Sequence, residues 1–327
     1  MRTRLYRHGV LERADFPLGE ISDHVQETDV TIWIDLVQPD GATLAQLGEE
    51  LGLHRLALED AAHERQRPKV DVYAEHLFLT VYDVDGITED EPTGGAFHFD
   101  VRELAVFVTR NVLITVRKDP GINLDEVLAR WDESADLAKY GVAFLLWGLL
   151  DVLVDRHFAA VEALDARLDQ LEDQLFEPAA HDITQRRSFA LRKALLRLRR
   201  VILPMREVVS VLMRHDLPAP TEAMTPYWFD VYDHTQRAAE WTESIREMVA
   251  TVTETTVALQ GNRLNLITKK VTGWAAIIAV PTAVTSFYGE NVPYPGFGHP
   301  AGFWTSVGLI VVVSLVLYVL FRRRDWL

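Results

Sequence analysis

The sequence contains no cysteine among its 327 residues. Disulfide bonds, thiolate metal sites, cysteine nucleophiles and covalent haem attachment are therefore excluded. The sequence also lacks a glycine-rich phosphate loop, a Walker-type lysine, a nucleophile elbow and a triad-like arrangement. An ATP-driven pump or an enzyme therefore finds no support. The 11 histidines are scattered without the spacing of metal ligands, so no zinc site is predicted.

Basic residues are outnumbered by acidic ones, which gives a formal net charge of −15. This excess argues against a nucleic-acid partner, because neutralising phosphates requires a basic surface. It suits divalent cations or a basic neighbouring surface, although many proteins are acidic only for solubility. Residues 1–8 carry arginines with no apolar segment after them, so no cleavable signal peptide is expected.

Two uncharged apolar segments, residues 271–289 and 300–321, lie near the end of the sequence. Each is long enough to cross a bilayer, which takes about 20 helical residues. Lysines precede the first segment and three arginines follow the second, whereas the connecting loop has no lysine or arginine. The pattern predicts a membrane hairpin in residues 271–327 with both chain ends in the cytoplasm.

The first part of the chain, residues 1–120, is expected to be a cytosolic α/β domain. Apolar runs predict strands at 31–36, 77–82, 97–101, 104–108 and 112–116, and a helix at 43–53. An acidic hairpin is expected around Asp85-Gly86, and a tight turn at residues 109–111.

Residues 121–225 are expected to be a helical cytosolic segment. An acidic amphipathic helix is predicted at 140–176, ending before Pro178, and arginines and lysines alternate with leucines over residues 186–202. We interpret the two as an antiparallel pair. The alternative, a basic nucleic-acid-binding face, is less well supported because the acidic helix lies next to it.

A stalk helix is predicted over residues 226–270, continuing into the first membrane segment. Such a helix of about 60 residues would be roughly 90 Å long, too long to be buried in one small domain. An apolar stripe along it indicates either packing between subunits or packing against the chain's own helical pair. The stripe comprises Ala238, Trp241, Ile245, Val249, Val252 and Val257.

One face of the first membrane segment is small and weakly polar. Steps of three and four residues from Asn265 give Thr268, Thr272, Ala275, Ala279, Thr282 and Ser286. Bulky residues that suit lipid or the second segment occupy other positions, namely Trp274, Ile277, Ile278, Val284 and Phe287. Such a small-residue face serves helix packing, or it lines an ion pathway. The second interpretation requires a homo-oligomer, because one helix cannot enclose a pore.

Four separated motifs occur in a fixed order along nearly the whole chain. They are Leu58-Glu59-Asp60 followed by Gln66-Arg67-Pro68-Lys69-Val70, then Asp230-Val231-Tyr232-Asp233-His234-Thr235, Tyr288-Gly289-Glu290-Asn291, and a basic run ending in Trp326-Leu327. With these motifs the chain resembles the CorA metal ion transporters, which include the ZntB zinc transporters. The resemblance implies an α+β membrane protein with an N-terminal α/β/α cytosolic domain, a long stalk helix and two C-terminal transmembrane helices. It also implies a homopentameric funnel in the cytoplasmic membrane.

The resemblance also assigns an ion pathway. Asn291 matches the asparagine of the family's Gly-Met-Asn signature at the outer pore mouth, and Gly289 matches its glycine. Thr282 matches a pore-lining threonine, and the inner pore positions are Asn265, Thr268, Val271 and Ala279. Several of these are smaller than the bulky apolar residues that form a hydrophobic gate in the family, which puts a gate at this place in doubt.

Glu290 stands where the signature has methionine. A carboxylate repeated around five subunits would concentrate cations if it faced the mouth. Alternatively, it faces sideways and pairs with another residue. In either case the departure weakens the assignment of magnesium as the ion.

In the cytosolic part, Asp60 and Asp230 match a pair of acids that binds a regulatory divalent cation between neighbouring subunits. Glu59, Asp151 and Asp155 resemble acids that line the same interface. Magnesium prefers carboxylate oxygens and retained water, which suits such a site. On their own, Asp151 and Asp155 would be interpreted as an exposed helical face, because they are four residues apart.

The resulting functional prediction is a passive, gated channel for divalent cations, Mg2+ first and Co2+ or Ni2+ next, that closes when cytosolic ions bind between subunits. The divalent cation is both cargo and regulator, the partners are other copies of the chain and the lipid bilayer, and no nucleic acid or enzymatic activity is expected. One alternative is a ZntB-like zinc transporter, with or without proton coupling. Another is a membrane-anchored cytosolic sensor that transports nothing.

Overall fold

The computed structural model of the chain describes residues 1–27, 29–63, 66–89, 97–175, 181–214, 222–290, 293–294 and 296–327. They form two compact units, Met1–Val252 and Thr253–Leu327. One uninterrupted helix, α7 (Thr225–Tyr288), contributes to both units, as the stalk prediction requires. The finer division of the chain at residues 120, 225 and 270 stays a prediction.

The first unit contains a seven-stranded mixed sheet with the strand order β2-β1-β3-β7-β6-β5-β4. Only the central pair, β3 and β7, is parallel, and the other neighbours are antiparallel. The strands are β1 (Arg2–Arg7), β2 (Val10–Ala14), β3 (Val30–Val37), β4 (Lys69–Val72), β5 (Leu77–Glu89), β6 (Phe97–Val108) and β7 (Val112–Arg117).

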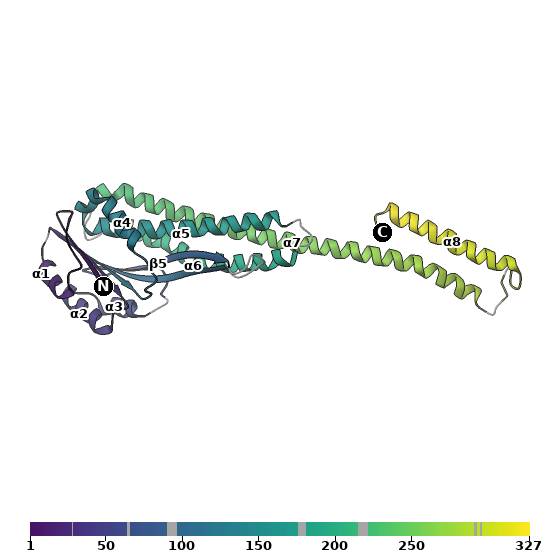
Figure 1. Ribbon diagram of the computed structural model, residues 1–327, viewed down its shortest axis with the longest axis horizontal. Helices are drawn as coiled ribbons and strands as arrows, with labels where there is room; N and C mark the ends of the chain where they lie inside the picture. Colours follow the sequence, from purple (N-terminus) through teal and green to yellow (C-terminus); the bar gives the residue numbers. More distant parts are fainter. Residues whose placement is uncertain are drawn as a thin grey trace. The chain divides into compact units, whose positions relative to one another are not determined.

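Side chains alternate across this sheet and form two separate cores. In β5, Phe78 packs in the core beneath the first three helices, whereas Leu79 and Val81 pack beneath the later ones. Figure 1 shows α1, α2 and α3 on one face and α4 and α5 on the other. The predicted three-layer α/β/α arrangement is confirmed. The helices are α1 (Ile21–His24), α2 (Gly41–Leu51), α3 (Arg55–Ala62), α4 (Asp125–Glu133), α5 (Val142–Asp173) and α6 (His181–Arg214), with short 3-10 turns at Leu18–Glu20, Ala135–Tyr140 and Glu222–Met224.

Two local predictions in the sheet are wrong. The two strands pair antiparallel as expected, but the turn predicted at Asp85-Gly86 is misplaced, because β5 continues to Glu89 with only a register shift between Asp85 and Thr88. Gly86 has a φ of +60°, the left-handed conformation that glycine adopts without strain. The two strands expected at 97–101 and 104–108 are one strand, β6, since the charged residues between them find ionic partners in Asp100 of the same strand and in Lys118, just after β7.

The acidic and basic helices pack side by side as predicted. Leucines of α5 and α6 lie in one core, with Leu164, Leu168 and Leu171 contributed by α5. The α7 stripe joins this core through Ala238, Ile245, Val249 and Val252, whereas Val257 is 57% exposed. The stripe up to Val252 is therefore explained by packing within one chain, and it carries no information about subunit contacts. Pro178 lies outside the described residues.

The second unit consists of the last part of α7 and the antiparallel helix α8 (Pro300–Arg323), which runs beside it (Figure 1). Both helices are long and apolar enough to cross a membrane, with a mean hydropathy of 1.4 and 2.4 over their most apolar stretches. Almost none of the side chains in these stretches is fully buried within a single chain, as expected for helices surrounded by lipid or other subunits.

Candidate ion pathway and interfacial carboxylates

The α7 residues that pack on α8 form one stripe. Between residues 271 and 288 the partly or fully buried positions are Gly273, Ala276, Ile277, Val280, Pro281, Val284 and Tyr288. Gly273 is in close contact, since a Cβ atom there would lie 3.3 Å from a methyl carbon of Leu327. The Trp274 and Tyr318 rings, 6.5 Å apart between centroids, add a contact between the helices at the edge of this stripe.

The small, weakly polar face of α7 lies on the opposite side. At 100° per residue, Ala279, Thr282 and Ser286 are about 140° to 200° around the axis from Ile277. All three are exposed, as are Asn265 and Thr268. Val271, also predicted to line the inner pore, is 64% exposed. The face is thus not used to hold α8, and no helix among the described residues of the chain packs upon it.

Threonine hydroxyl groups on α7 have oxygen atoms that can still accept hydrogen bonds or bind a cation. The Thr282 hydroxyl donates to the Ile278 carbonyl at 3.4 Å, and the Thr285 hydroxyl donates to the Pro281 carbonyl at 2.8 Å. Because the hydrogen of each hydroxyl is directed to the backbone, the oxygen lone pairs remain for water or a hydrated cation. The absence of an N–H on Pro281 also leaves the Ile277 carbonyl without its usual helical donor.

The outer end of α7 requires a glycine. The Gly289 N–H donates to the Thr285 carbonyl at 2.9 Å, and a Cβ at residue 289 would lie 2.9 Å from that oxygen. Aromatic rings of Tyr288, Tyr294 and Phe297 pack edge to face beside this turn. Glu290 follows, exposed to solvent. The predicted site residue Asn291 lies outside the described residues.

The acids predicted to line the regulatory site separate into two groups within one chain. Asp60 and Glu59 lie on α3, which covers one face of the sheet. Asp151 and Asp155 lie on α5, and Asp230 lies on α7, with both helices packed on the other face.

The first group is already paired with a lysine. The Lys69 Nζ is 2.6 Å from an Asp60 carboxylate oxygen, and the Gln66 amide donates to the other oxygen at 3.4 Å. Glu59 is exposed beside it. The Asp60 side chain is 28% exposed, so its carboxylate can still be approached from solvent.

The second group surrounds an arginine. Arg130, on α4, contacts Asp151 at 2.8 Å and Asp155 at 3.2 Å. Burial raises the pKa of the Asp151 carboxyl to about 6; the positive charge of Arg130 opposes this shift, and the nearby Asp155 and Asp230 carboxylates add to it. Asp230 is 61% exposed and has His234 at 4.0 Å.

These carboxylates do not complete a metal site in one chain. Within the described ranges, no group of three or more His, Cys, Asp or Glu side chains is placed to hold an ion. Asp60 and Asp230 are nevertheless accessible carboxylates of the type that hard divalent cations prefer. They fit such an ion only if the two come from different copies of the chain.

Comparison with known proteins gives the family. A model of the family described as CorA-like Mg2+ transporter protein matches residues 28–323. The chain belongs to this CorA family. A curated relative, the cobalt/magnesium transport protein CorA of Thermotoga maritima, is 28% identical over 92% of this chain and 85% of its own length. The zinc transport protein ZntB of Pectobacterium atrosepticum is 24% identical over 95% and 92%, respectively.

The fold agrees with a solved structure of the CorA magnesium transporter from Methanocaldococcus jannaschii. The TM-score is 0.76 at 22% sequence identity, and the match covers 100% of this chain and 99% of that one. This likeness establishes that the CorA fold, with its soluble α/β domain, long helix and C-terminal apolar helices, extends over the whole chain.

Lys69 and Arg130 are two parts of this CorA chain's acidic sites that sequence reasoning missed. Lys69 stands within one of the recognised motifs, but the motif gives no sign that it pairs with Asp60. Arg130 is 21 residues before Asp151 and follows no helical spacing relative to it. Only the packing of α4 on α5 brings these two charges together.

Proposed function

We propose that the chain assembles as a homopentamer and forms a passive, gated channel for divalent cations, with Mg2+ as the main cargo and Co2+ and Ni2+ as related ones. The observation that carries this proposal is the side of α7 on which the small, weakly polar face lies. A face that served only to pack the hairpin would contact α8, whereas this one is directed away from it. Five such faces around an axis would line a pore with hydroxyl and amide groups.

In this proposal Glu290 and Asn291 stand at the outer mouth, with Gly289 allowing the tight turn before them. Thr282 lies one site further in, and Ala279, Val271, Thr268 and Asn265 line the inner part. Lysines 269 and 270 and arginines 322 to 324 support a mouth outside the cytoplasmic membrane and both chain ends inside, by the positive-inside tendency. The Asp60 and Asp230 carboxylates of neighbouring subunits bind the regulatory cation, with Glu59, Asp151 and Asp155 near that interface.

In this proposal the channel closes because a bound cation neutralises the carboxylates between subunits. Interfacial carboxylates that share a cation are neutralised, and the ring of subunits is held together. When the cytosolic ion is lost, repulsion between the carboxylates loosens the interface and favours the open state. The regulatory ion thus acts through its stronger binding to the closed state.

Ion flux into liposomes tests the proposal. The purified protein is reconstituted, and uptake of Mg2+, Co2+, Ni2+ and Zn2+ is compared with and without a pH gradient. We expect Mg2+ uptake down its gradient that is indifferent to pH and that Asn291→Ala abolishes. Unchanged uptake in Asn291→Ala would contradict its place at the mouth, and absence of flux from an assembled pentamer would favour a membrane-anchored sensor.

A second candidate is a ZntB-like zinc transporter coupled to protons. The exposed Glu290 carboxylate favours it, because an acid in place of methionine at the mouth can bind a proton or a borderline cation such as Zn2+. Zinc uptake that rises with an inward proton gradient would support this candidate over the channel.

A further inference from the structure

Lys69, on β4, is held between two carboxylates. Its Nζ is 2.6 Å from Asp60 and 2.6 Å from Asp71. Asp60 is on α3, while Asp71 is on β4 two residues from the lysine. The ammonium group therefore bridges an acid of the proposed regulatory site and an acid that has no part in that site.

The surroundings keep this lysine charged and close to Asp60. Burial acts to lower its pKa, but the hydrogen bonds with Asp60 and Asp71 outweigh that effect, so the pKa lies above its ordinary value. The Phe78 ring, with its centroid 5.7 Å from the Nζ, adds a favourable cation–π contact. Among the described residues, Lys69 provides the only side-chain cation within ion-pair distance of the Asp60 carboxylate.

Lys118 does not take over this role. Its Nζ donates to the main-chain carbonyl of Asp60 at 3.2 Å and forms an ion pair with Glu103 at 2.6 Å. It therefore fixes the end of α3 and leaves the Asp60 carboxylate to Lys69.

We propose that Lys69 is a built-in competitor for the divalent cation at Asp60, and that Asp71 is the site to which its ammonium group withdraws. This inference rests on the proposed regulatory function of Asp60. A carboxylate oxygen in an ion pair must give up its partner to bind a metal ion, which weakens metal binding by the free energy of that pair. Because Lys69 keeps Asp71, it is not left without a counter-charge.

Lys69 and Asp71 then change the Mg2+ concentration needed for closure in opposite directions. Removing the lysine charge frees Asp60, so less Mg2+ is needed for closure. Removing the Asp71 charge strengthens the hold of Lys69 on Asp60, so more Mg2+ is needed. Each change is expected to shift the half-saturating Mg2+ concentration about fivefold, as for one partly exposed ion pair.

The experiment uses the full-length protein and two readouts. One is the Mg2+ concentration that gives half-maximal protection of the cytosolic unit from chymotrypsin, and the other is the concentration that half-inhibits flux in liposomes. The test variants are Lys69→Met, Lys69→Arg and Asp71→Asn. The matched control is Arg67→Met, which removes the same charge from an exposed side chain two residues away.

We expect Lys69→Met to lower both concentrations, Asp71→Asn to raise them, and Lys69→Arg and Arg67→Met to stay within twofold of the native values. Shifts of equal sign in Lys69→Met and Asp71→Asn, or an equal shift in Arg67→Met, would overturn the competitor role. If Lys69→Met does not fold, Asp71→Asn alone tests the competitor role: higher Mg2+ concentrations in both measurements support it, and unchanged or lower ones overturn it.

The variant Asp60→Asn distinguishes failure of the competitor role of Lys69 from failure of the proposed regulatory role of Asp60. A loss of the Mg2+ response in Asp60→Asn, with no shift in the Lys69 and Asp71 variants, overturns only the competitor role. An unchanged response in Asp60→Asn removes Asp60 from regulation and overturns both.

Discussion

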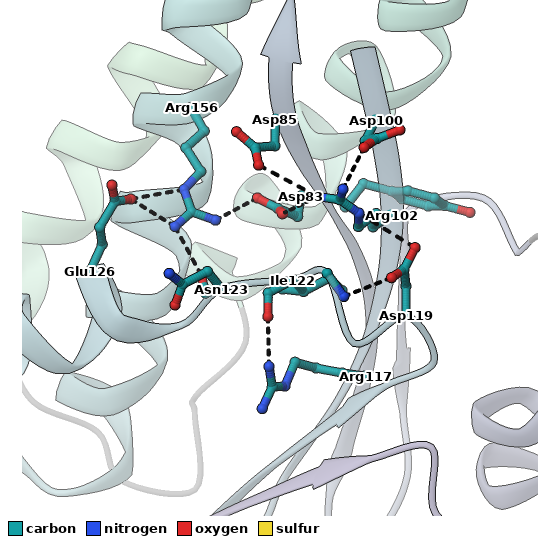
Figure 2. Close-up of polar contacts among 12 residues, drawn as sticks. Asp83, Asp85, Asp100, Arg102, Arg117, Asp119, Ile122, Asn123, Glu126 and Arg156 are labelled. Atoms are coloured by element: carbon teal, nitrogen blue, oxygen red, sulfur yellow. Dashed lines mark hydrogen bonds and ion pairs between the residues drawn. The ribbon is translucent and has the colours of Figure 1, made fainter. Parts of the chain in front are cut away.

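Replacing Arg156 with methionine is expected to leave a buried charge without its main partner. Arg156, on α5, contacts Asp83 at 2.7 Å and Glu126 at 2.7 Å, and its guanidinium also donates to the Asn123 carbonyl at 2.9 Å (Figure 2). The Asp83 side chain is only 1% exposed. Its second cation, Arg102, is 4.0 Å away and is shared with Asp85, Asp100 and Asp119.

The expected loss in the free energy of unfolding is about 3–5 kcal/mol, the range for breaking a buried ion pair by removing one partner. The exposed contact with Glu126 contributes little to it, since exposed pairs are worth at most about 1 kcal/mol. Replacing both members, Asp83→Leu with Arg156→Met, should recover much of the loss, because no charge is then left unpaired.

The loss should also depend on pH. Burial already raises the pKa of the Asp83 carboxyl, with Arg156 acting in the opposite direction, so removing Arg156 raises this pKa further. A carboxyl with a raised folded-state pKa costs stability above that pKa, and the cost disappears as the pH falls below the unfolded value of about 3.9. The deficit of Arg156→Met relative to the native protein should therefore shrink between pH 7 and pH 4.

Denaturant unfolding of the first unit, followed by near-ultraviolet circular dichroism, measures these differences. Arg200→Met, which removes an exposed arginine from α6, is the control and should change stability by less than about 0.5 kcal/mol. A deficit in Arg156→Met no larger than in this control, or a double variant as unstable as the sum of its singles, would contradict a stabilising buried ion pair between Asp83 and Arg156.

Two further predictions concern a buried histidine and the outer mouth. Burial lowers the pKa of His157 to about 4, and its Nε2–H donates to the Tyr82 carbonyl at 2.8 Å. The unfolded chain therefore gains a proton below pH 6.5 that the folded chain does not, which costs roughly 3 kcal/mol as the pH falls to 4. His157→Gln should flatten the pH dependence of unfolding in this range, and an unchanged slope would contradict the buried neutral state. Glu290→Met should raise the Mg2+ concentration for half-maximal uptake at low ionic strength but not at high salt; an increase equal at both salt concentrations would exclude an electrostatic role at the mouth.

Much of the fold could be predicted because its signals are local and repetitive. The apolar run at 31–36 predicts β3, the leucine spacing of the acidic helix predicts α5, and the long run without proline or glycine predicts the part of α7 before Gly261. The strands β1, β2 and β4 were not found. All five residues of the edge strand β2 are exposed, and the charged Lys69 and Asp71 interrupt the apolar pattern of β4.

The errors in β5 and β6 have one cause. Asp85 with Gly86, and Arg102 with Glu103, are polar pairs that interrupt an apolar pattern and were therefore interpreted as turns or breaks. In the structure Arg102 is surrounded by carboxylates of β5, β6 and the segment after β7, and Glu103 pairs with Lys118 (Figure 2 shows the Arg102 group). Such ion pairs join segments that are distant in the sequence, so no local sequence pattern predicts them.

In the candidate site, too, some features could be predicted from the sequence and others depend on tertiary packing. The small residues of α7 recur with helical periodicity and can be recognised in the sequence. Their position opposite α8 depends on how the two helices pack. The acids Asp60 and Asp230 stand in recognisable motifs. Their placement on opposite faces of the sheet, and the lysine and arginine that neutralise the two acidic groups, required the structure.

Cysteine scanning can test whether the face of α7 directed away from α8 lines the ion path, because the chain has no cysteine of its own. Single cysteines are introduced on the proposed pore face (Thr272→Cys, Ala279→Cys and Ser286→Cys) and on the α8 side (Ile277→Cys, Val280→Cys and Val284→Cys). Flux into liposomes is then measured before and after a positively charged thiol reagent is added. We expect the reagent to block flux through the first three variants and not through the second three. Block confined to the α8 side, or block without helical period, would contradict it.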